Sequence, residues 1–381
     1  MFLRQVQFPP RQSFFLFGPR ATGKSTLVHQ RLAAGSTRFI DLLLPSVEET
    51  YARDPDLLYR EVLALPDTID TVVIDEIQKL PRLLDVVHKC LFETRRRFVL
   101  TGSSARKLRR GSANLLAGRA VERTLHPLTR HELGDAFDLE SVLAWGSLPA
   151  IAALSETERA DYLKAYCHGY LKEEVWGEHL IRQLDPFRKF LEVAAQHDGR
   201  TINLAAIGRD VGVDPKTVRE YYHILEDTLV GFIVEPYTRS LRKRVHKAPR
   251  FLFFDLGVSR ALSHQLTMAP VPGTSAYGEL FERFFILEML RREAYCSRDY
   301  RFFYLATERN EVDLVIERPG KRLAVVEVKS SLEVRPDKLR SLLALETAFT
   351  DPELFCVSRD PRPQCIGSVQ ALPWEIALEV L

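Results

Sequence analysis

The sequence predicts a multidomain α/β protein with a parallel sheet at its N-terminus. The chain has 381 residues, more than one ordinary compact domain holds, so two or three domains are expected. Short apolar segments alternate with segments of helical spacing up to about residue 140, as in a parallel sheet that helices cover on both faces. The first apolar segment, SFFLF at residues 13–17, leads directly into a glycine-containing loop.

The composition is that of a globular protein. Hydrophobic residues make up 46% and charged residues 27%, which excludes a disordered chain, a collagen-like repeat and a coiled-coil rod. Lys and Arg total 53 against 51 Asp and Glu, so any affinity for nucleic acid must come from local patches. No segment approaches the roughly 20 apolar residues that span a bilayer, and the N-terminus lacks the pattern of a secretion signal. A cytoplasmic protein is therefore expected, with five scattered cysteines as reduced thiols.

Residues 18–25, GPRATGKS, fit the phosphate-loop pattern G-x-x-x-x-G-K-[ST] in full. The loop lies between a predicted strand and a predicted helix that starts at Thr26, so backbone N–H groups and the helix N-terminus favour bound phosphate. Lys24 is expected to reach the β- and γ-phosphates of ATP, and Ser25 to ligate Mg²⁺. The predicted contacts to the ATP phosphates are Gly18, Thr22, Gly23, Lys24, Ser25 and Thr26.

A second motif, VVIDE at residues 72–76, complements the phosphate loop. It predicts a buried strand that ends in a carboxylate, with Asp75 holding the hydrated Mg²⁺. Glu76 follows directly and is expected to polarise the attacking water as a general base. The alternative interpretation is a strand followed by two exposed acids without a role.

A third strand, ending in LTGSS at residues 100–104, could place a polar side chain beside the γ-phosphate. Thr101 and Ser103 are predicted as this phosphate sensor, and a simple strand-to-turn transition is the alternative. Basic residues follow, and Arg119 is preferred among them as an arginine finger that stabilises the transition state. A solvated basic face is the alternative for this segment, whose other members are Arg106, Lys107, Arg109, Arg110 and Arg123.

The pattern becomes mainly helical near residue 145. Segments 187–196, 204–211 and 215–228 predict three short helices, and 231–236 predicts a strand, a layout that resembles a winged helix at about 187–240. The last helix could expose Lys216, Thr217, Arg219 and Tyr222 toward DNA, with Asp214 as its cap. It also carries acidic residues, so a protein contact remains an alternative to DNA.

A basic run follows at residues 239–250, with six Lys or Arg and no acid. Phosphate contact is the functional interpretation of this run, and a solvated loop is the alternative. The residues predicted to contact DNA phosphates here are Arg239, Arg242, Lys243, Arg244 and Lys247.

Mixed strand and helix patterns return from residue 251, which suggests a separate α/β domain. Asp313 lies in one predicted strand, and Glu327 and Lys329 lie on the same face of another because side chains alternate along a strand. Two acids and a lysine could bind Mg²⁺ and position water for phosphodiester cleavage, with Glu279 as a third carboxylate. The alternative is an inherited fold whose charges form surface salt bridges worth about 0–1 kcal/mol each.

The order of GPRATGKS, VVIDE, LTGSS, LAGR and HPLTRHEL resembles a large prokaryotic family of AAA-type ATPases. The C-terminal part of that family is a domain of unknown function that resembles restriction endonucleases. The resemblance continues through WGSLP, EVDLVI and VVEVKSS and implies an ATP-binding core with the strand order of the additional-strand P-loop class. It also implies a D…ExK nuclease-like core, although Val312 stands where many members have proline. The expected domains are 1–140, an ATPase domain; 141–250, a helical region with the winged helix; and 251–381, a restriction-endonuclease-like domain.

Three functions remain open from the sequence. The first is an ATPase that couples nucleotide state to DNA binding, with DNA cleavage as an additional step. The second is a signalling switch that binds a protein partner through the winged helix and has an inactive nuclease-like domain. The third is a nuclease in which ATP is a structural ligand.

Overall fold

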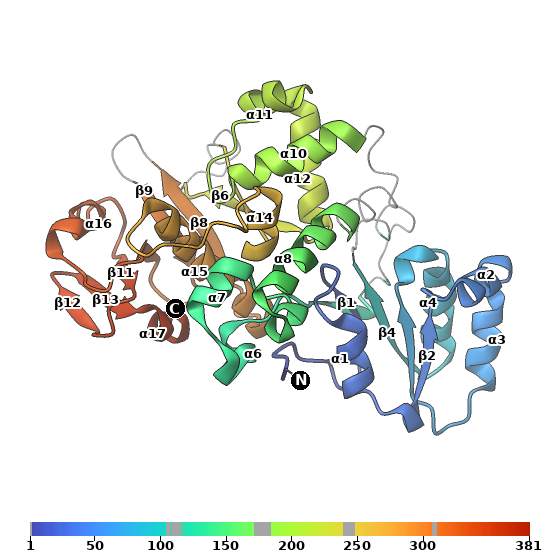
Figure 1. Ribbon diagram of the computed structural model, residues 1–381. Helices are drawn as coiled ribbons and strands as arrows, with labels where there is room; N and C mark the ends of the chain where they lie inside the picture. The colour runs from blue at the N-terminus through green and yellow to red at the C-terminus, as the bar shows by residue number, and fades with distance from the viewer. Residues whose placement is uncertain are drawn as a thin grey trace. The chain divides into compact units, whose positions relative to one another are not determined.

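The structure is a computed structural model that describes residues 2–103, 108, 116, 118–170, 184–238, 248–306 and 311–381. The chain forms two compact units, which Figure 1 shows with their helices and strands labelled. Unit 1 comprises Met1–Leu128, Leu148–Ala150 and Ile224–Val230. Unit 2 comprises Thr129–Ser147, Ile151–His223 and Gly231–Leu381. The boundary predicted after residue 140 falls inside a helix, and the boundary predicted after residue 250 falls inside a strand. Both lie within unit 2, because the helical region and the C-terminal strands pack together.

Unit 1 contains a five-stranded parallel sheet with the order β2-β3-β4-β1-β5. β4 lies between β1 and β3, as expected for the additional-strand class. All five residues of β1 and of β3 are buried, which explains why both strands read as continuous apolar runs. The strands are β1 (Ser13–Phe17), β2 (Thr37–Asp41), β3 (Thr71–Asp75), β4 (Arg97–Gly102) and β5 (Ala120–Thr124).

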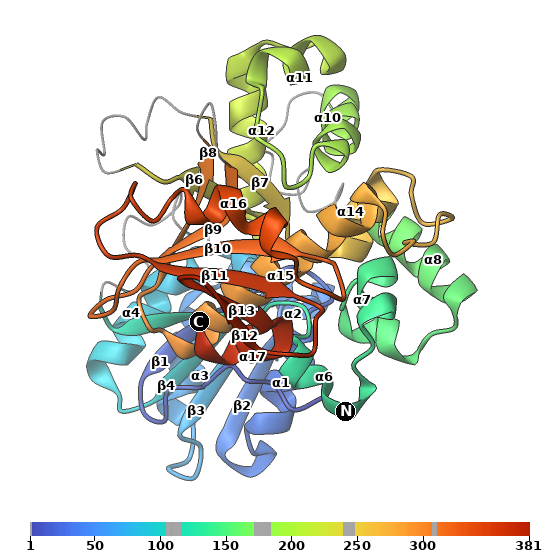
Figure 2. The ribbon, with the colours of Figure 1, turned by 90° about the vertical axis from the view of Figure 1, so that its left-hand side faces the viewer.

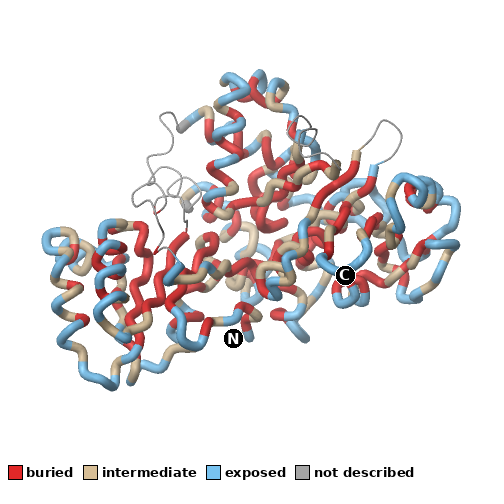
Figure 3. Tube along the Cα trace, turned by 180° about the vertical axis from the view of Figure 1, so that it is seen from behind, coloured by how far each residue is buried: buried red, intermediate tan, exposed pale blue. Residues whose placement is uncertain are grey.

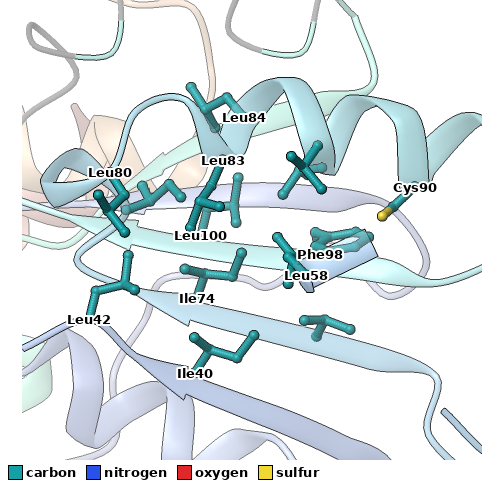
Figure 4. Packing of buried hydrophobic residues seen from close by; sticks show 14 of the residues in the cluster. Ile40, Leu42, Leu58, Ile74, Leu80, Leu83, Leu84, Cys90, Phe98 and Leu100 are labelled. Carbon is teal, nitrogen blue, oxygen red and sulfur yellow. The ribbon is translucent and has the colours of Figure 1, made fainter. Parts of the chain in front are cut away.

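Helices connect these strands and cover the sheet. They are α1 (Lys24–Arg31), α2 (Pro45–Arg53), α3 (Asp56–Ala64) and α4 (Leu83–Glu93), with short 3₁₀ turns η1 (Ala34–Ser36) and η2 (Ile77–Lys79). One apolar core joins β2, β3 and β4 to α3 and α4, and Figure 4 shows Ile74 and Leu100 beside Leu83 in this core. The core removes one face of the sheet from water and leaves the polar residues at the strand ends in fixed positions.

Unit 2 contains an eight-stranded mixed sheet with the order β12-β13-β11-β10-β9-β8-β6-β7. The strand predicted as a separate wing is β6, which pairs antiparallel with β7 and parallel with β8 and so belongs to the large sheet. The strands are β6 (Gly231–Pro236), β7 (Arg250–Phe253), β8 (Arg301–Ala306), β9 (Glu311–Glu317), β10 (Ala324–Lys329), β11 (Glu353–Ser358), β12 (Gln364–Ile366) and β13 (Val369–Pro373).

The helices of unit 2 fall into an N-terminal group and a group around the large sheet. The first group is α6 (Arg130–Leu133), η3 (Gly134–Ala136), α7 (Leu139–Trp145), η4 (Pro149–Ala153), α8 (Glu156–Ala165), η5 (Tyr166–Tyr170), α10 (Leu184–Gln196), α11 (Leu204–Val211) and α12 (Pro215–Asp227). The second is α14 (Leu256–Leu262), α15 (Ser275–Cys296), η6 (Pro336–Leu339), α16 (Arg340–Leu343) and α17 (Trp374–Val380). Figure 2 shows α17 beside the strands β12 and β13, and Figure 3 colours the chain by burial. β10 and β11 in the middle of the sheet are buried at all but one position each. The sheet therefore has a core of its own, separate from that of unit 1.

Residues 145–147, where the sequence pattern becomes mainly helical, pack against α14 in unit 2. Gly257 of α14 lies directly against the backbone of Trp145, because a Cβ at this position would come within 2.0 Å of the Trp145 carbonyl oxygen. Asp255 caps α14 by accepting from Val258 N and also accepts from Ser147 N at 2.8 Å. Close backbone approach and a buried cap together hold α7 against α14.

Gly257→Ala is expected to destabilise unit 2 by about 1–3 kcal/mol, since the added methyl group must displace a backbone segment. Urea unfolding of the full chain, followed by the fluorescence of Trp145 and Trp374, measures the loss. Gly278→Ala in α15 is the matched control, because its Cβ would meet only Ser330 Oγ at 3.7 Å. That control is expected to be neutral or slightly stabilising. Equal midpoints for wild type and Gly257→Ala would contradict the packing argument.

Candidate nucleotide-binding site and acidic pocket

The predicted phosphate loop connects β1 to α1 at the carboxyl edge of the unit 1 sheet. α1 begins at Lys24, two residues before the predicted start. Gly18 has no room for a side chain, because a Cβ there would come within 2.3 Å of the Leu125 carbonyl oxygen. Ala21 and Gly23 adopt positive φ values of 63° and 89°, which curl the loop toward the N-terminus of α1. The local sequence therefore produces the loop geometry that phosphate binding requires.

Side chains of the loop and of α1 lie where they could contact a nucleotide. Lys24 is buried and donates to the carbonyl oxygens of Gly18 (2.8 Å) and Pro19 (3.2 Å), acceptors that phosphate oxygens could replace. Thr22 Oγ1 donates to the Pro19 carbonyl oxygen at 2.8 Å and supports the loop from within. Thr26 is exposed in the first turn of α1. These positions agree with the predicted contacts to ATP phosphates.

Ser25 and Asp75 line one cavity of about 540 Å³ between α1, β2, β3 and α2. A hydroxyl and a carboxylate that face the same space are the oxygen donors that Mg²⁺ takes together with phosphate oxygens and water. Asp41, at the end of β2, lines the same cavity and is the register partner of Asp75. The residues present therefore fit a hydrated Mg²⁺ bound with ATP.

Thr101 lies at the end of β4, as the sequence predicts, and makes two hydrogen bonds to residues at the end of β3. Its hydroxyl donates to Asp75 and accepts from the backbone N of Glu76 at 3.2 Å, and its side chain is fully buried. Both hydrogen bonds tie β4 to the end of β3. Thr101 therefore supports the acidic pair instead of contacting the γ-phosphate, since its proton is already donated to Asp75.

Glu76 and Ser103 are connected through Gln78, which the sequence analysis did not select. Gln78 Nε2 donates to the Glu76 carboxylate and to Ser103 Oγ at 3.1 Å. Glu76 has a left-handed backbone with φ 59°, which is rare for a residue other than glycine. Ser103 is buried at the end of β4 and stays a predicted phosphate sensor. The only sequence signal for Gln78 is its place two residues after Glu76.

Arg4 is a second residue that sequence reasoning missed. Its guanidinium donates to the carbonyl oxygens of Thr22 (2.7 Å) and His126 (2.5 Å), and only 6% of the residue is exposed. Arg4 thereby links the phosphate loop to the segment after β5. No signal in the sequence could have found it, because it lies 14 residues before the loop in a segment without periodicity.

The structure excludes Arg119 as an arginine finger that acts within its own site. Arg119 immediately precedes β5, and β5 runs parallel to β1 with Ala120 opposite Ser13. Arg119 thus lies at the amino edge of the sheet, whereas the phosphate loop lies at the carboxyl edge. Its guanidinium stacks over the ring of Phe92, 5.5 Å from the centroid, near the end of α4. A contact to ATP by Arg119 would require another copy of the chain.

Unit 2 contains an acidic pocket of about 450 Å³ around the predicted nuclease-like residues. Asp313 on β9 and Glu327 and Lys329 on β10 line this pocket, so the structure brings the three together as expected. Lys329 Nζ is paired with Glu327, and Asp313 Oδ2 accepts from Val328 N at 2.7 Å. The pocket also holds several arginine side chains around its acids, among them Arg200 and Arg250.

The third carboxylate near Asp313 is Glu282, whereas the sequence analysis named Glu279. Glu279 lines the same pocket but is paired with Arg200 at 3.0 Å. Glu282 lies one helical turn further along α15, and its charge acts directly on Asp313. Arg250 pairs with Glu282 at 3.2 Å and partly offsets this charge.

Burial and like charges make the acidic pocket unfavourable for ionised Asp313. Burial, followed by the charges of Glu282 and Glu327, raises the pKa of Asp313 well above its ordinary value. Burial also raises the pKa of Glu282, although Arg250 opposes this effect. Burial tends to lower the pKa of Lys329, but Glu327 outweighs it and the pKa is raised. Within the described ranges, no three His, Cys, Asp or Glu side chains are arranged to hold a metal ion.

Most residues predicted to contact DNA lie outside the described residues. These are Arg239, Arg242, Lys243, Arg244 and Lys247, and the same holds for Arg106, Lys107, Arg109 and Arg110 near the phosphate loop. Lys216 is exposed in α12, and Arg219 lies one turn further along the same helix. The prediction that Tyr222 faces DNA is wrong, because its ring is buried against Phe190. Asp214 caps this helix by accepting from Lys216 N and Thr217 N, as predicted.

Helices long and apolar enough to cross a bilayer are absent from the described part of the chain.

The fold and the loop geometry of unit 1 define a P-loop nucleotide-binding protein. Three family models match consecutive segments: an AAA domain at residues 10–134, a domain of unknown function (DUF8612) at 136–268, and a domain of unknown function (DUF4143) at 277–376. The chain belongs to the AAA-type ATPases that carry a C-terminal DUF4143 domain, as the resemblance in sequence indicated.

Individual relatives are distant. An uncharacterized protein of Haemophilus influenzae is 20% identical over 300 residues, which cover 72% of this chain and 73% of that protein. The crystal structure of domain III from the Thermotoga maritima replication initiation protein DnaA matches with 17% identity and a TM-score of 0.24. That match covers 58% of this chain and 86% of the other, and at this TM-score it adds nothing to the argument.

Arg4→Ala is expected to weaken ATP binding about 10-fold or more, because hydrogen bonds from a charged donor contribute about 1.5–3 kcal/mol and here hold the phosphate loop. Calorimetric titration of the full chain with ATP measures the change. Arg123→Ala is the matched control, since Arg123 donates to Gln7 O in the same N-terminal segment but does not contact the loop. ATP affinity that is the same in Arg4→Ala and wild type would show that the loop needs no such support.

Proposed function

We propose that the protein is a Mg²⁺-dependent ATPase that couples its nucleotide state to DNA binding. The observation that carries the ATPase proposal is the meeting of three strand ends at one edge of the unit 1 sheet. The phosphate loop follows β1, Asp75 and Glu76 end β3, and Ser103 ends β4. The family match to an AAA domain over the same residues supports the proposal.

Each residue of this edge has a separate task in the proposed reaction. Lys24 and the N–H groups of the loop bind the phosphate chain and balance its negative charge. Ser25 and Asp75 hold Mg²⁺, which would neutralise charge that develops on the phosphate oxygens. Glu76 accepts a proton from the attacking water, and burial of this carboxylate keeps bulk water away from it.

DNA binding is proposed for α12 and the basic run that follows it. Lys216 on α12 is exposed, and Arg219 lies close by on the same helix after the Asp214 cap, as in the recognition helix of a winged helix. Residues 239–247 add five basic side chains without an acid, a composition that favours phosphate contact. The three helices α10, α11 and α12 support the winged-helix interpretation of this part of the chain, although β6 belongs to the large sheet.

Lys24→Ala is expected to abolish ATP turnover while the fold is retained, because the loop loses the cation that binds the phosphates. Phosphate release is measured with Mg²⁺, with and without duplex DNA, and Lys164→Ala at an exposed position is the matched control. Stimulation of wild-type ATP turnover by DNA supports the coupling. The double variant Lys216→Glu, Arg219→Glu should then turn over ATP at a rate that DNA does not change. Turnover that Lys24→Ala does not change would contradict the ATPase proposal.

A protein-partner switch is the alternative to the DNA-coupled ATPase. In this case ATP turnover orders the helical region for a protein partner, and the acidic pocket has no catalytic role. The acidic residues of α12 favour this alternative, because they reduce the basic character of the helix. ATP turnover that is indifferent to DNA would support the switch.

A second candidate function is Mg²⁺-dependent phosphodiester cleavage in unit 2. The specific observation in its favour is the pocket that gathers Glu282, Asp313, Glu327 and Lys329. Asp313 and Glu327 could hold the metal, and Lys329 could position the water that attacks phosphorus. A divalent ion there would favour the ionised carboxylate of Asp313, whose pKa is raised by burial and by the charges of Glu282 and Glu327. The nuclease-like fold proposed for residues 251–381 rests on this arrangement.

Asp313→Asn is expected to abolish Mg²⁺-dependent cleavage and to raise the thermal midpoint of the metal-free protein at neutral pH. The pKa of Asp313 is higher in the folded than in the unfolded chain, so its ionisation costs folding free energy above the folded pKa. This cost disappears as the pH falls toward the unfolded pKa, and it is absent in the amide.

Thermal unfolding at neutral pH with and without Mg²⁺ measures both effects, alongside a plasmid-cleavage assay. Mg²⁺ should raise the midpoint of wild type and leave that of Asp313→Asn unchanged. Asp337→Asn, at an exposed position of η6, is the matched control and should behave as wild type. A midpoint that Mg²⁺ does not shift in wild type would rule out the metal site.

A further inference from the structure

The side chain of Gln78 connects the end of β3 to the end of β4 in unit 1. It lies in η2, two residues after Glu76. Its Nε2 donates one hydrogen bond to the Glu76 carboxylate and one to Ser103 Oγ, the latter at 3.1 Å. Only 7% of Gln78, 8% of Glu76 and 3% of Ser103 are exposed. Because solvent does not compete at this depth, the two hydrogen bonds restrict where the Glu76 carboxylate lies.

Packing does not explain why a glutamine stands at this position. Its Oε1 is buried and has no hydrogen-bond partner among the described residues. The same oxygen lies against Gly102, where a Cβ would come within 2.6 Å of it. An unsatisfied buried carbonyl lowers stability, and an apolar side chain of equal length would avoid this loss. The amide orientation itself follows from Glu76, since the reverse orientation would place two oxygens together.

The direction in which Gln78 holds Glu76 follows from the strand order. β4 lies between β1, which leads into the phosphate loop, and β3, which carries Glu76. Ser103 at the end of β4 is therefore nearer to the phosphate loop than β3 is. A carboxylate tied to Ser103 points toward the position of the γ-phosphate. The left-handed backbone of Glu76 and its N–H bond to Thr101 place the carboxylate within reach of Gln78.

We propose that Gln78 is the positioning residue that orients Glu76 toward the water that attacks ATP. This inference rests on the proposed ATPase function. In the step concerned, the water oxygen forms a bond to the γ-phosphorus while the bond from that phosphorus to the β,γ-bridging oxygen breaks, and ADP leaves. The proton of the water goes to the Glu76 carboxylate. Gln78 exchanges no proton; it holds the carboxylate through Nε2 and shares that nitrogen with Ser103.

The test is Gln78→Met in the full chain, assayed for steady-state ATP turnover with Mg²⁺. Methionine has a similar length and no hydrogen-bond donor, so the side chain keeps its volume and releases Glu76. The kcat is expected to fall at least about 10-fold, and by no more than the roughly 10²–10⁴-fold that loss of the general base itself costs. KM for ATP and ATP affinity by calorimetry are expected to stay at wild-type values, and the thermal midpoint is expected not to fall, because methionine also removes the unsatisfied carbonyl.

A double-mutant cycle with Glu76→Gln separates positioning from a general structural role. In the Glu76→Gln background, Gln78→Met should cause no further loss of kcat, because no base remains to be oriented. Lys79→Met, one residue further in the same turn, is the matched control and should keep the wild-type kcat. Gly102→Ala tests the same interaction without a substitution at Gln78. Its methyl group should displace the Gln78 amide and thereby lower kcat.

The outcomes distinguish the inference from the function on which it rests. Wild-type turnover together with an unchanged kcat in Gln78→Met overturns the inference and leaves the ATPase proposal standing. If Gln78→Met lowers both kcat and the thermal midpoint, and its effect on kcat adds to that of Glu76→Gln, then Gln78 has a structural role. That result also overturns the inference. Wild-type protein that binds ATP without turnover removes both proposals. The positioning role is established if Gln78→Met lowers kcat alone and if this effect disappears in the Glu76→Gln background.

Discussion

The buried hydroxyl of Thr101 holds together the part of unit 1 on which the proposed nucleotide chemistry depends. It donates to Asp75 and accepts from the backbone of Glu76, so it fixes two neighbouring residues of β3 against β4. A hydroxyl in a fully buried position makes stronger hydrogen bonds than one in water, and losing it would leave two buried groups unpaired. Since β4 also adjoins β1, the same two bonds set the position of the acidic pair relative to the phosphate loop.

Features that depend on local sequence could be predicted, and features that depend on neighbours in space could not. The loop from Gly18 to Ser25 carries its own geometry, because its glycines and the following helix determine where its N–H groups point. Thr101 was correctly placed at a strand end, but its partners are set by the order of strands. Arg4 and Gln78 act through residues that no periodicity connects to them.

Two further differences between prediction and structure have simple geometric reasons. Arg119 is close in sequence to the end of β4, yet it stands before β5, and a parallel strand carries its first residue to the opposite edge of the sheet. Glu279 and Glu282 are three residues apart on α15 and therefore lie on similar faces of the helix. Only the packing of α15 on β10 decides that Glu282 is the one near Asp313.

Both candidate sites contain groups whose arrangement lowers the stability of the fold. In unit 1 the left-handed backbone of Glu76 and the unpaired Oε1 of Gln78 cost free energy that the surrounding core must offset. In unit 2 the pKa of Asp313 is raised, so the ionised carboxylate is disfavoured in the folded chain. Asp313 lines the acidic pocket, and Glu76 and Gln78 lie just after β3, so these costs do not arise in the apolar cores.

A sequence selected for stability alone would replace such groups. Methionine at residue 78 would remove an unsatisfied carbonyl, and asparagine at residue 313 would remove a buried charge, in both cases with little change in volume. Strain and unfavourable charge that persist where cheaper side chains would fit are expected where a ligand completes the arrangement. Under the proposed cleavage function this ligand would be a cation for Asp313, which would reverse the effect of the neighbouring acids. Under the proposed ATPase function it would be the nucleotide for Gln78, because the position in which Glu76 is held matters only when a γ-phosphate and a water lie before it.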